Sequence, residues 1–230
     1  MTHALRQILW IVQKDLLIEW RARARLFSLI CFALTAVLLF TFAVGPKPNV
    51  LRSFSGAFVW LALLFSSTAL LSKSIRVEEE SGAMDSLLLV PTRPAALFYG
   101  KAISNTLQLI VLGIITTPVM LILSDVPDQP MLREPVWMLM ASMVLGSMGL
   151  AAPGTLYAAL TARVPGQQLL LPLLLFPLIV PTLLAAVTST SRVFTGNQMG
   201  DAQDWLQILL FIDAIYWSLC GVLFERVIEQ

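Results

Sequence analysis

Two groups of ionisable residues in this sequence could do chemistry, and they lie in very different surroundings. The first is the stretch RVEEESGAMDSLLLVPTRP at residues 76–94, which holds four acids within eight positions: Glu78, Glu79, Glu80 and Asp85. The second is Asp213, the one charged residue within the apolar run 205–224. Acids beside exposed apolar residues could dock a partner, whereas a carboxyl group inside an apolar run could line a pathway or an interface.

The acidic stretch predicts a short helix that is acidic at its start and apolar at its end. Glu78–Glu80 would begin this helix, where carboxylates suit the positive end of the helix dipole. Met84, Leu87 and Leu88 would form an apolar patch about one turn long, and Pro91 would end the helix. This pattern indicates a docking surface, and the alternative is a solvated loop whose leucines lie among lipid headgroups.

Asp213 would be costly to leave in contact with lipid. A charged residue at the centre of a bilayer costs about 2.5–3.5 kcal/mol on insertion scales. We therefore expect Asp213 to face protein or water, with Tyr216, one turn later, as a candidate hydrogen-bond partner. A pathway or interface residue and a carboxyl group satisfied for packing by a neighbouring helix both remain open.

Several kinds of catalytic chemistry are not predicted. The sequence has no G-x-x-x-x-G-K-[ST] loop that could cradle ATP phosphates. His3 is the only histidine, so neither a His/Cys/carboxylate metal cluster nor a C-x-x-C-H haem attachment is present. Cys31 and Cys220 both lie in apolar runs and are interpreted as apolar fillers, not as a disulfide. An intramembrane enzyme is therefore poorly supported.

The elements that would position these residues are membrane helices. Of the 230 residues, 57% are hydrophobic and 13% charged, and the mean hydropathy is +0.81. A soluble domain has about 45–50% apolar and about 25% charged residues. We predict an all-α polytopic protein with a single membrane domain over 1–230 and six transmembrane helices, at about 26–44, 53–72, 102–124, 135–160, 168–188 and 205–224.

The distribution of Lys and Arg predicts the orientation. Eleven of these residues flank the spans on the side of the N-terminus and four on the other side. By the positive-inside rule, both termini and the 76–101 loop should be cytoplasmic. The 25 residues before the first span and the full length of that span argue against a cleaved signal peptide. The net charge of +1 gives no indication of a nucleic-acid partner.

The residues before the first span predict an amphipathic helix on the cytoplasmic leaflet. Apolar residues recur there at helical spacing: Leu5, Ile8, Leu9, Val12, Leu16 and Trp20. The alternative is an ordinary basic flank that enforces the topology.

Two spans have unusual composition. In the fifth span Pro172, Pro177 and Pro181 predict either a broken helix that lines a pathway or simple kinked packing. In the fourth span Ser142, Gly146 and Gly149 would let neighbouring helices approach closely.

The acidic stretch also resembles a known coupling segment. Type-2 ABC transporter permeases have an E-x-G-x-x-E-x-L-L-x-x-P pattern between spans two and three, and the matching residues here are Glu80, Gly82, Asp85, Leu87, Leu88 and Pro91, with Gly100-Lys101 before the third span. Asp85 stands where that superfamily usually has Glu, a departure that keeps the charge.

Over its whole length the sequence is similar to one branch, the CcmB family, which is the permease component of the cytochrome c maturation system and is called haem exporter protein B. The most characteristic parts are KDLLIEWRARARLFS at 14–28 and the run EEESGAMDSLLLVP. The resemblance implies a multi-pass protein of the bacterial inner membrane that couples ATP hydrolysis by a partner to haem export or to release of a haem-loaded chaperone.

The resemblance also implies partners. Two copies of the chain would pair, and an ATPase subunit called CcmA would bind ATP and Mg and dock on the coupling helix. CcmC and CcmD would associate with this complex, and haem would pass to the chaperone CcmE. The implied contact residues for the ATPase are Glu78, Glu79, Glu80, Gly82, Met84, Asp85, Leu87, Leu88 and Pro91. With no internal histidine to bind haem iron, mechanical coupling is favoured over tight haem binding, and no cofactor is predicted for this chain itself. The alternative is a type-2 exporter of another substrate, such as a lipid or a drug.

Overall fold

The computed structural model describes residues 2–45, 47–80, 94–124, 136–161, 167–195 and 199–228. These residues form seven helices and no strand, which confirms the all-α prediction: α1 (Thr2–Arg21), α2 (Arg23–Val44), α3 (Pro48–Glu80), α5 (Pro94–Leu123), α6 (Val136–Thr161), α7 (Gln167–Thr195) and α8 (Met199–Ile228). All except α1 are long and apolar enough to cross a membrane. The prediction of six spans is thereby confirmed.

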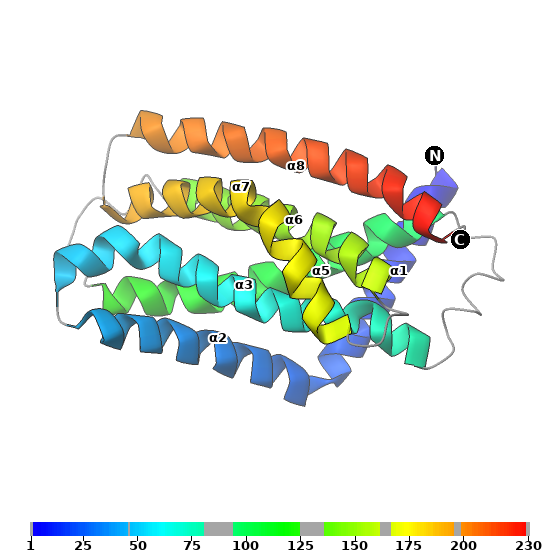
Figure 1. Ribbon diagram of the computed structural model, residues 1–230, viewed down its shortest axis with the longest axis horizontal. Coiled ribbons are helices and arrows are strands. Elements are labelled where there is room, and N and C mark those ends of the chain that lie inside the picture. The colour runs from blue at the N-terminus through cyan, green and yellow to red at the C-terminus, as the bar shows by residue number, and fades with distance from the viewer. Residues whose placement is uncertain are drawn as a thin grey trace.

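The six long helices pack lengthwise into one bundle, and α1 lies across one end of it (Figure 1). Helices α3 and α6 are central: 67% of the apolar window of α3 and 61% of that of α6 are buried, against 22% for α2. The start of α1 and the end of α8 lie at the same end of the bundle (Figure 1). An even number of spans requires this arrangement.

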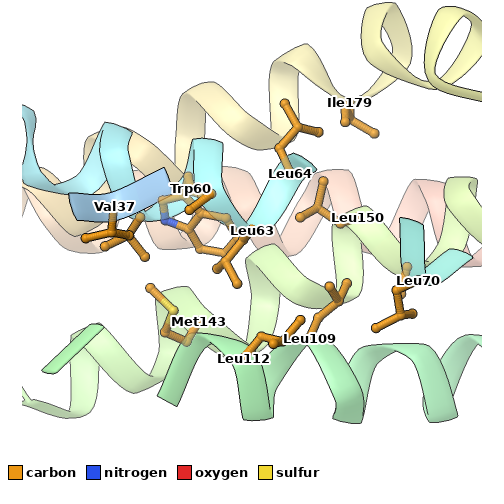
Figure 2. Packing of buried hydrophobic residues seen from close by; sticks show 14 of the residues in the cluster. Val37, Trp60, Leu63, Leu64, Leu70, Leu109, Leu112, Met143, Leu150 and Ile179 are labelled. Atoms are coloured by element: carbon orange, nitrogen blue, oxygen red, sulfur yellow. The ribbon is translucent and has the colours of Figure 1, made fainter. Parts of the chain in front are cut away.

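The main core forms where α3 meets its neighbours. Trp60 and Leu63 of α3 face Leu112 of α5 and Met143 of α6 (Figure 2). Trp60 is fully buried, and its indole Nε1 donates a 2.9 Å hydrogen bond to Thr190 Oγ1 of α7. This one side chain therefore links the centre of the bundle to α7.

The small residues predicted on the fourth span do permit close helix packing. Ser142 Oγ lies 2.7 Å from Ser189 Oγ of α7 in a buried hydroxyl pair. A Cβ atom added at Gly146 would overlap the Trp60 ring, and one added at Gly149 would overlap the side chain of Thr182. Helix α6 thus approaches α3 and α7 most closely where it carries no bulky side chain.

Helix α7 is continuous through its three prolines. Its first part runs at an angle to its second part in Figure 1. A proline removes one backbone hydrogen bond and bends a helix without necessarily ending it. The structure therefore favours kinked packing over a broken fifth span.

The expected start of a helix at Glu78 is wrong, because Glu78–Glu80 form the last turn of α3. No Gly or Pro occurs between Ser72 and Glu80 to stop the helix, and the first such residue is Gly82. With 33 residues, α3 is about 50 Å long, whereas the hydrocarbon core of a bilayer is about 30 Å thick. The end of α3 thus extends beyond the apolar part of the bundle.

Candidate functional site

The acidic segment is held between two helices of the bundle. Glu78–Glu80 are part of α3, and α5 begins at Pro94. The remaining contact residues of the prediction lie outside the described residues: Gly82, Met84, Asp85, Leu87, Leu88 and Pro91. The chain therefore connects this segment directly to the ends of α3 and α5, whatever conformation the segment itself takes.

The start of α5 also holds α1. A Cβ atom on Gly100 would lie 2.7 Å from Ile11 Cγ2, so the absence of a side chain at Gly100 lets the two helices touch. Ile11 and Val12 are buried in this contact, whereas Leu5 and Leu9 remain exposed. The predicted apolar stripe therefore only partly coincides with the face of α1 that packs: Val12 is buried, whereas Leu5, Leu9 and Trp20 are exposed.

A charged contact next to Gly100 strengthens the attachment of α1. Lys101 is only 1% exposed, and its Nζ lies 3.6 Å from Asp15 Oδ2 of α1. Asp15 also lies 3.3 Å from Lys14 Nζ through its other oxygen. Because burying an ammonium group without a counter-charge is strongly unfavourable, Asp15 holds α1 to α5 at a fixed register.

A second ion pair fixes the corner between α1 and α2. Arg25 donates from Nε to Glu19 Oε1 at 2.9 Å, and its second guanidinium nitrogen pairs with Glu19 Oε2. This two-bond geometry is directionally specific, because the planar guanidinium group matches a carboxylate. The corner is therefore a defined turn and not a loose joint.

Helix α1 is also part of the apolar core at this end of the bundle. Ile11 packs in a cluster with Phe98 of α5, Leu156 of α6 and Phe224 of α8. The rings of Phe98 and Phe224 are 5.3 Å apart. A displacement of the start of α5 would thus move α1, α6 and α8 together, since close-packed side chains transmit strain.

The second candidate residue, Asp213, lies in α8 and is 3% exposed. This confirms that it faces protein and not lipid. The expected hydrogen bond with Tyr216 is wrong, because the Tyr216 hydroxyl donates to the backbone oxygen of Leu178 in α7 at 2.6 Å. Neither carboxylate oxygen of Asp213 has a hydrogen-bond partner in the part of the chain that the structure describes.

Sequence patterns alone do not reveal the contacts of four residues of these sites. Asp15 is not part of the predicted apolar stripe of α1, and nothing in the sequence singles out Thr182. The Gly100-Lys101 pair belongs to a recognisable pattern, but its contact with α1 is not expected from it. A Lys at the edge of an apolar run, together with an acid in an otherwise basic flank, is the signal that could indicate the ion pair.

The described residues contain no group of three or more His, Cys, Asp or Glu side chains that could hold a metal ion. Both cysteines are free, Cys31 at the surface of α2 and Cys220 buried in α8. Around the acidic segment, the described residues thus show α3 ending at Glu80, α5 beginning at Pro94, and α1 packed against the start of α5.

Comparison with known proteins agrees with this geometry. The family model described as "CcmB protein" matches residues 6–224. Among curated relatives, the "Heme exporter protein B" of Rhodobacter capsulatus is 30% identical over 186 residues, covering 81% of this chain and 83% of the relative. The proteins of that name from Pseudomonas aeruginosa and Paracoccus denitrificans are each 29% identical, with coverage of 83% and 88% of both chains, respectively. With the family model matching nearly the whole length, this six-span chain belongs to the CcmB family.

Proposed function

We propose that this chain is the membrane-spanning permease subunit of an ABC transporter that acts in haem export for cytochrome c maturation. In this proposal a separate ATPase subunit, CcmA, binds ATP and Mg and docks on residues 78–91. ATP hydrolysis there drives haem export or release of the haem-loaded chaperone CcmE, with CcmC and CcmD in the same complex. Two copies of the chain form the membrane half. The single observation that carries the proposal is the CcmB family match over residues 6–224.

The position of the acids on α3 supports a docking role. Negative charges at the C-terminal end of a helix oppose the helix dipole, at a cost of roughly 0.3–1 kcal/mol each near the last turn. Glu78–Glu80 occupy that end, and the last turn of α3 has no basic residue. Three acids in an unfavourable position are thus not explained by the stability of α3, and a basic surface on a partner would offset their cost.

The attachment of α1 supports mechanical coupling in the same way. A partner that pulls on residues 78–91 pulls on the end of α3 and the start of α5, and the Asp15–Lys101 pair brings α1 along with α5. His3 is the only histidine of the sequence, so we assign binding of haem iron to a partner subunit and its displacement to this chain. The exposed apolar residues of α1, Leu9 and Trp10 among them, would then lie at the membrane surface.

The complex itself provides the test. The chain, purified together with the proteins encoded by the neighbouring genes, should hydrolyse ATP, and hydrolysis should increase the amount of haem-loaded chaperone that leaves the membrane fraction. ATP hydrolysis that responds to an added lipid or drug but leaves the chaperone unchanged would favour an exporter of another substrate.

The chain alone should not hydrolyse ATP. The motivation is the missing phosphate-binding loop, without which backbone amides have no cradle for the phosphates. Phosphate release by the purified permease should equal that of a sample without protein, and addition of the ATPase should raise it. ATP hydrolysis by the permease when it is free of contaminating ATPases would refute the proposal that a separate subunit hydrolyses ATP.

Both ends of the chain should be cytoplasmic in the bacterial inner membrane, as the eleven-to-four distribution of Lys and Arg predicts. A reporter that is active only in the periplasm should give no signal when it is fused after Gln230. The matched control is the same reporter inserted after Lys47, between α2 and α3, where activity is expected. The reverse pattern of signals would invert the proposed orientation and move the acidic segment away from any cytoplasmic ATPase.

A further inference from the structure

Asp213 has a position that neither the fold nor the proposed coupling explains. It lies within two residues of the middle of its span, and so do Gly149 of α6 and Thr182 of α7. These three residues therefore meet at the depth that is farthest from water on both sides of the membrane. Among the buried apolar side chains that fill the bundle, a carboxyl group at this depth needs a specific reason.

The three residues meet over the bare backbone of Gly149. The Thr182 methyl carbon Cγ2 is the atom nearest to the point that a Cβ atom on Gly149 would occupy, Asp213 Oδ1 lies 2.6 Å from it and Thr182 Oγ1 3.2 Å. Any side chain at position 149 would therefore overlap the Thr182 methyl group and an oxygen of Asp213. The glycine leaves room for the carboxyl group at a contact of three helices.

The hydroxyl group of Thr182 is in an unusual state for a helical threonine. Other buried threonines donate to the backbone oxygen four residues earlier: Thr106 to Ala102, Thr116 to Leu112 and Thr155 to Ala151. For Thr182 that oxygen belongs to Leu178, and it accepts the hydroxyl of Tyr216 instead. Thr182 Oγ1 makes no hydrogen bond of normal geometry among the described residues, although the Tyr216 hydroxyl lies close enough to interact with it, and both oxygens of Asp213 have no partner there.

None of the ion pairs of the described residues includes Asp213. The titratable side chains in the middle of the helices packed around it are Tyr157 on α6 and Tyr216 and Cys220 on α8. On α5, which also packs against α8, they are Tyr99, whose ring stacks on Trp217, and Lys101, which pairs with Asp15. On α7 the nearest basic residue is Arg192, which is ten residues from Thr182 and so about 15 Å along the helix. An ionised carboxylate would therefore be buried at mid-membrane without a counter-charge.

A metal ion fits this site poorly. The two oxygens of Asp213 and the one of Thr182 make three ligands, whereas Mg²⁺ and Ca²⁺ take six or more. A protonated carboxyl group fits better, since it carries no net charge and needs no counter-ion in an apolar surrounding.

We propose that Asp213 is a proton-binding site: packed against Gly149, 3% exposed and without a counter-charge, it carries a proton, and in this neutral form it lies at the contact of α6, α7 and α8. Release of the proton leaves a carboxylate and transfers H⁺ to water, so release requires water to reach the middle of the bundle and α7 to separate from α8. The proposal concerns the protonation of this chain and does not depend on what the complex transports.

Dicyclohexylcarbodiimide tests the proposal, because this apolar reagent adds to protonated carboxyl groups and is inert toward carboxylates. The protein purified in detergent should acquire the adduct at Asp213 at neutral pH, located by mass spectrometry of its peptides. Asp204 and Glu225 lie exposed on the same helix and serve as internal controls, which should stay unmodified. Absence of the adduct at Asp213 in monodisperse protein would overturn the proposal. The proposal would also be overturned if sodium ions protected Asp213 from the reagent to the same extent at every pH.

Infrared spectroscopy tests the protonation directly. The carbonyl band of a protonated carboxyl group should be present in the wild type and absent in Asp213→Asn. In Thr182→Val, a variant of the same shape, the band should persist, because the proton belongs to Asp213 and Thr182 makes no hydrogen bond to it. Loss of the band in Thr182→Val, or its absence in the wild type, would refute the proposal. If Asp213→Asn fails to fold, the carbodiimide adduct and Thr182→Val still decide the question in an otherwise intact chain.

Discussion

Co-purification of the ATPase subunit is expected to be lost when Leu87 and Leu88 are both changed to Asp. In the proposed complex these two side chains are buried against the partner, and each buried leucine contributes roughly 1.5–3 kcal/mol. An exposed ion pair contributes only about 0.2–1 kcal/mol. Since 1.4 kcal/mol corresponds to about a tenfold change in affinity, each substitution should weaken binding by tenfold or more. The measurement is the ratio of ATPase to permease after affinity purification through a tag on the permease.

The acidic residues should matter less than the leucines. Glu78→Gln or Glu79→Gln should lower the amount of bound ATPase only slightly, because each removes a single charge at the end of α3 and leaves the leucines in place. Glu80→Lys should lower it more, since it replaces attraction by repulsion. This order of effects separates docking through an apolar patch from docking through charge alone.

Leu89→Asp is the matched control for the leucine pair. It introduces a charge one residue later, at a variable position of the E-x-G-x-x-E-x-L-L-x-x-P pattern and off the face that Met84, Leu87 and Leu88 would share on the predicted helix. The control and the double variant should both insert into the membrane normally, since no span is altered. If the Leu87→Asp, Leu88→Asp variant retains the ATPase at wild-type stoichiometry, the docking site lies elsewhere and the proposed role of residues 78–91 is wrong.

The spans can be predicted from the sequence because crossing a bilayer is a local property of about 20 apolar residues. Their ends are less accurate where a charge has a distant partner. The third span is expected to start at 102, after Lys101, whereas α5 begins at Pro94. Lys101 marks a boundary in the sequence because a lysine in an apolar run is unfavourable by itself, and the compensating Asp15 comes from a helix more than 80 residues away in the chain.

The candidate site shows the same limit. The acids at 78–80 stand out in the sequence. Their fit to the positive end of a helix dipole predicts a helix start only if the preceding helix has already ended, whereas α3 continues to Glu80. Tyr216 is expected to pair with Asp213 because residues one turn apart share a face of a helix. The backbone oxygen of Leu178 in α7 binds that hydroxyl instead. Local spacing names the candidates for a hydrogen bond, and tertiary packing chooses among them.

A single methyl group at Gly146 should measurably destabilise the bundle. The Cβ atom of Gly146→Ala would lie 2.6 Å from Cζ2 and 2.8 Å from Cζ3 of Trp60, and closer still to Cη2. The indole ring has no room to retreat, because it is 0% exposed and its Nε1 is bonded to Thr190. Overpacking of a close-packed core costs about 1–3 kcal/mol, and loss of the indole hydrogen bond would add about 1 kcal/mol. Heating in detergent, followed by size-exclusion chromatography of what remains monodisperse, should show a clearly lower midpoint than for the wild type.

Gly113→Ala is the matched control, since it adds the same methyl group to a neighbouring span helix against a softer neighbour. There the nearest atom is Met143 Sδ at 3.0 Å, and the next is Leu63 Cδ1 at 3.7 Å. A methionine side chain has three rotatable bonds and can adjust, whereas the buried indole is rigid and anchored. Gly113→Ala should therefore melt close to the wild type, and Trp60→Phe should partly rescue Gly146→Ala by giving the methyl group space. Equal melting midpoints for the two alanine variants would mean that α6 and α3 can move apart at no cost. The contact between Trp60 and Gly146 would then not be rigid, and the proposed mechanical coupling would lose its support.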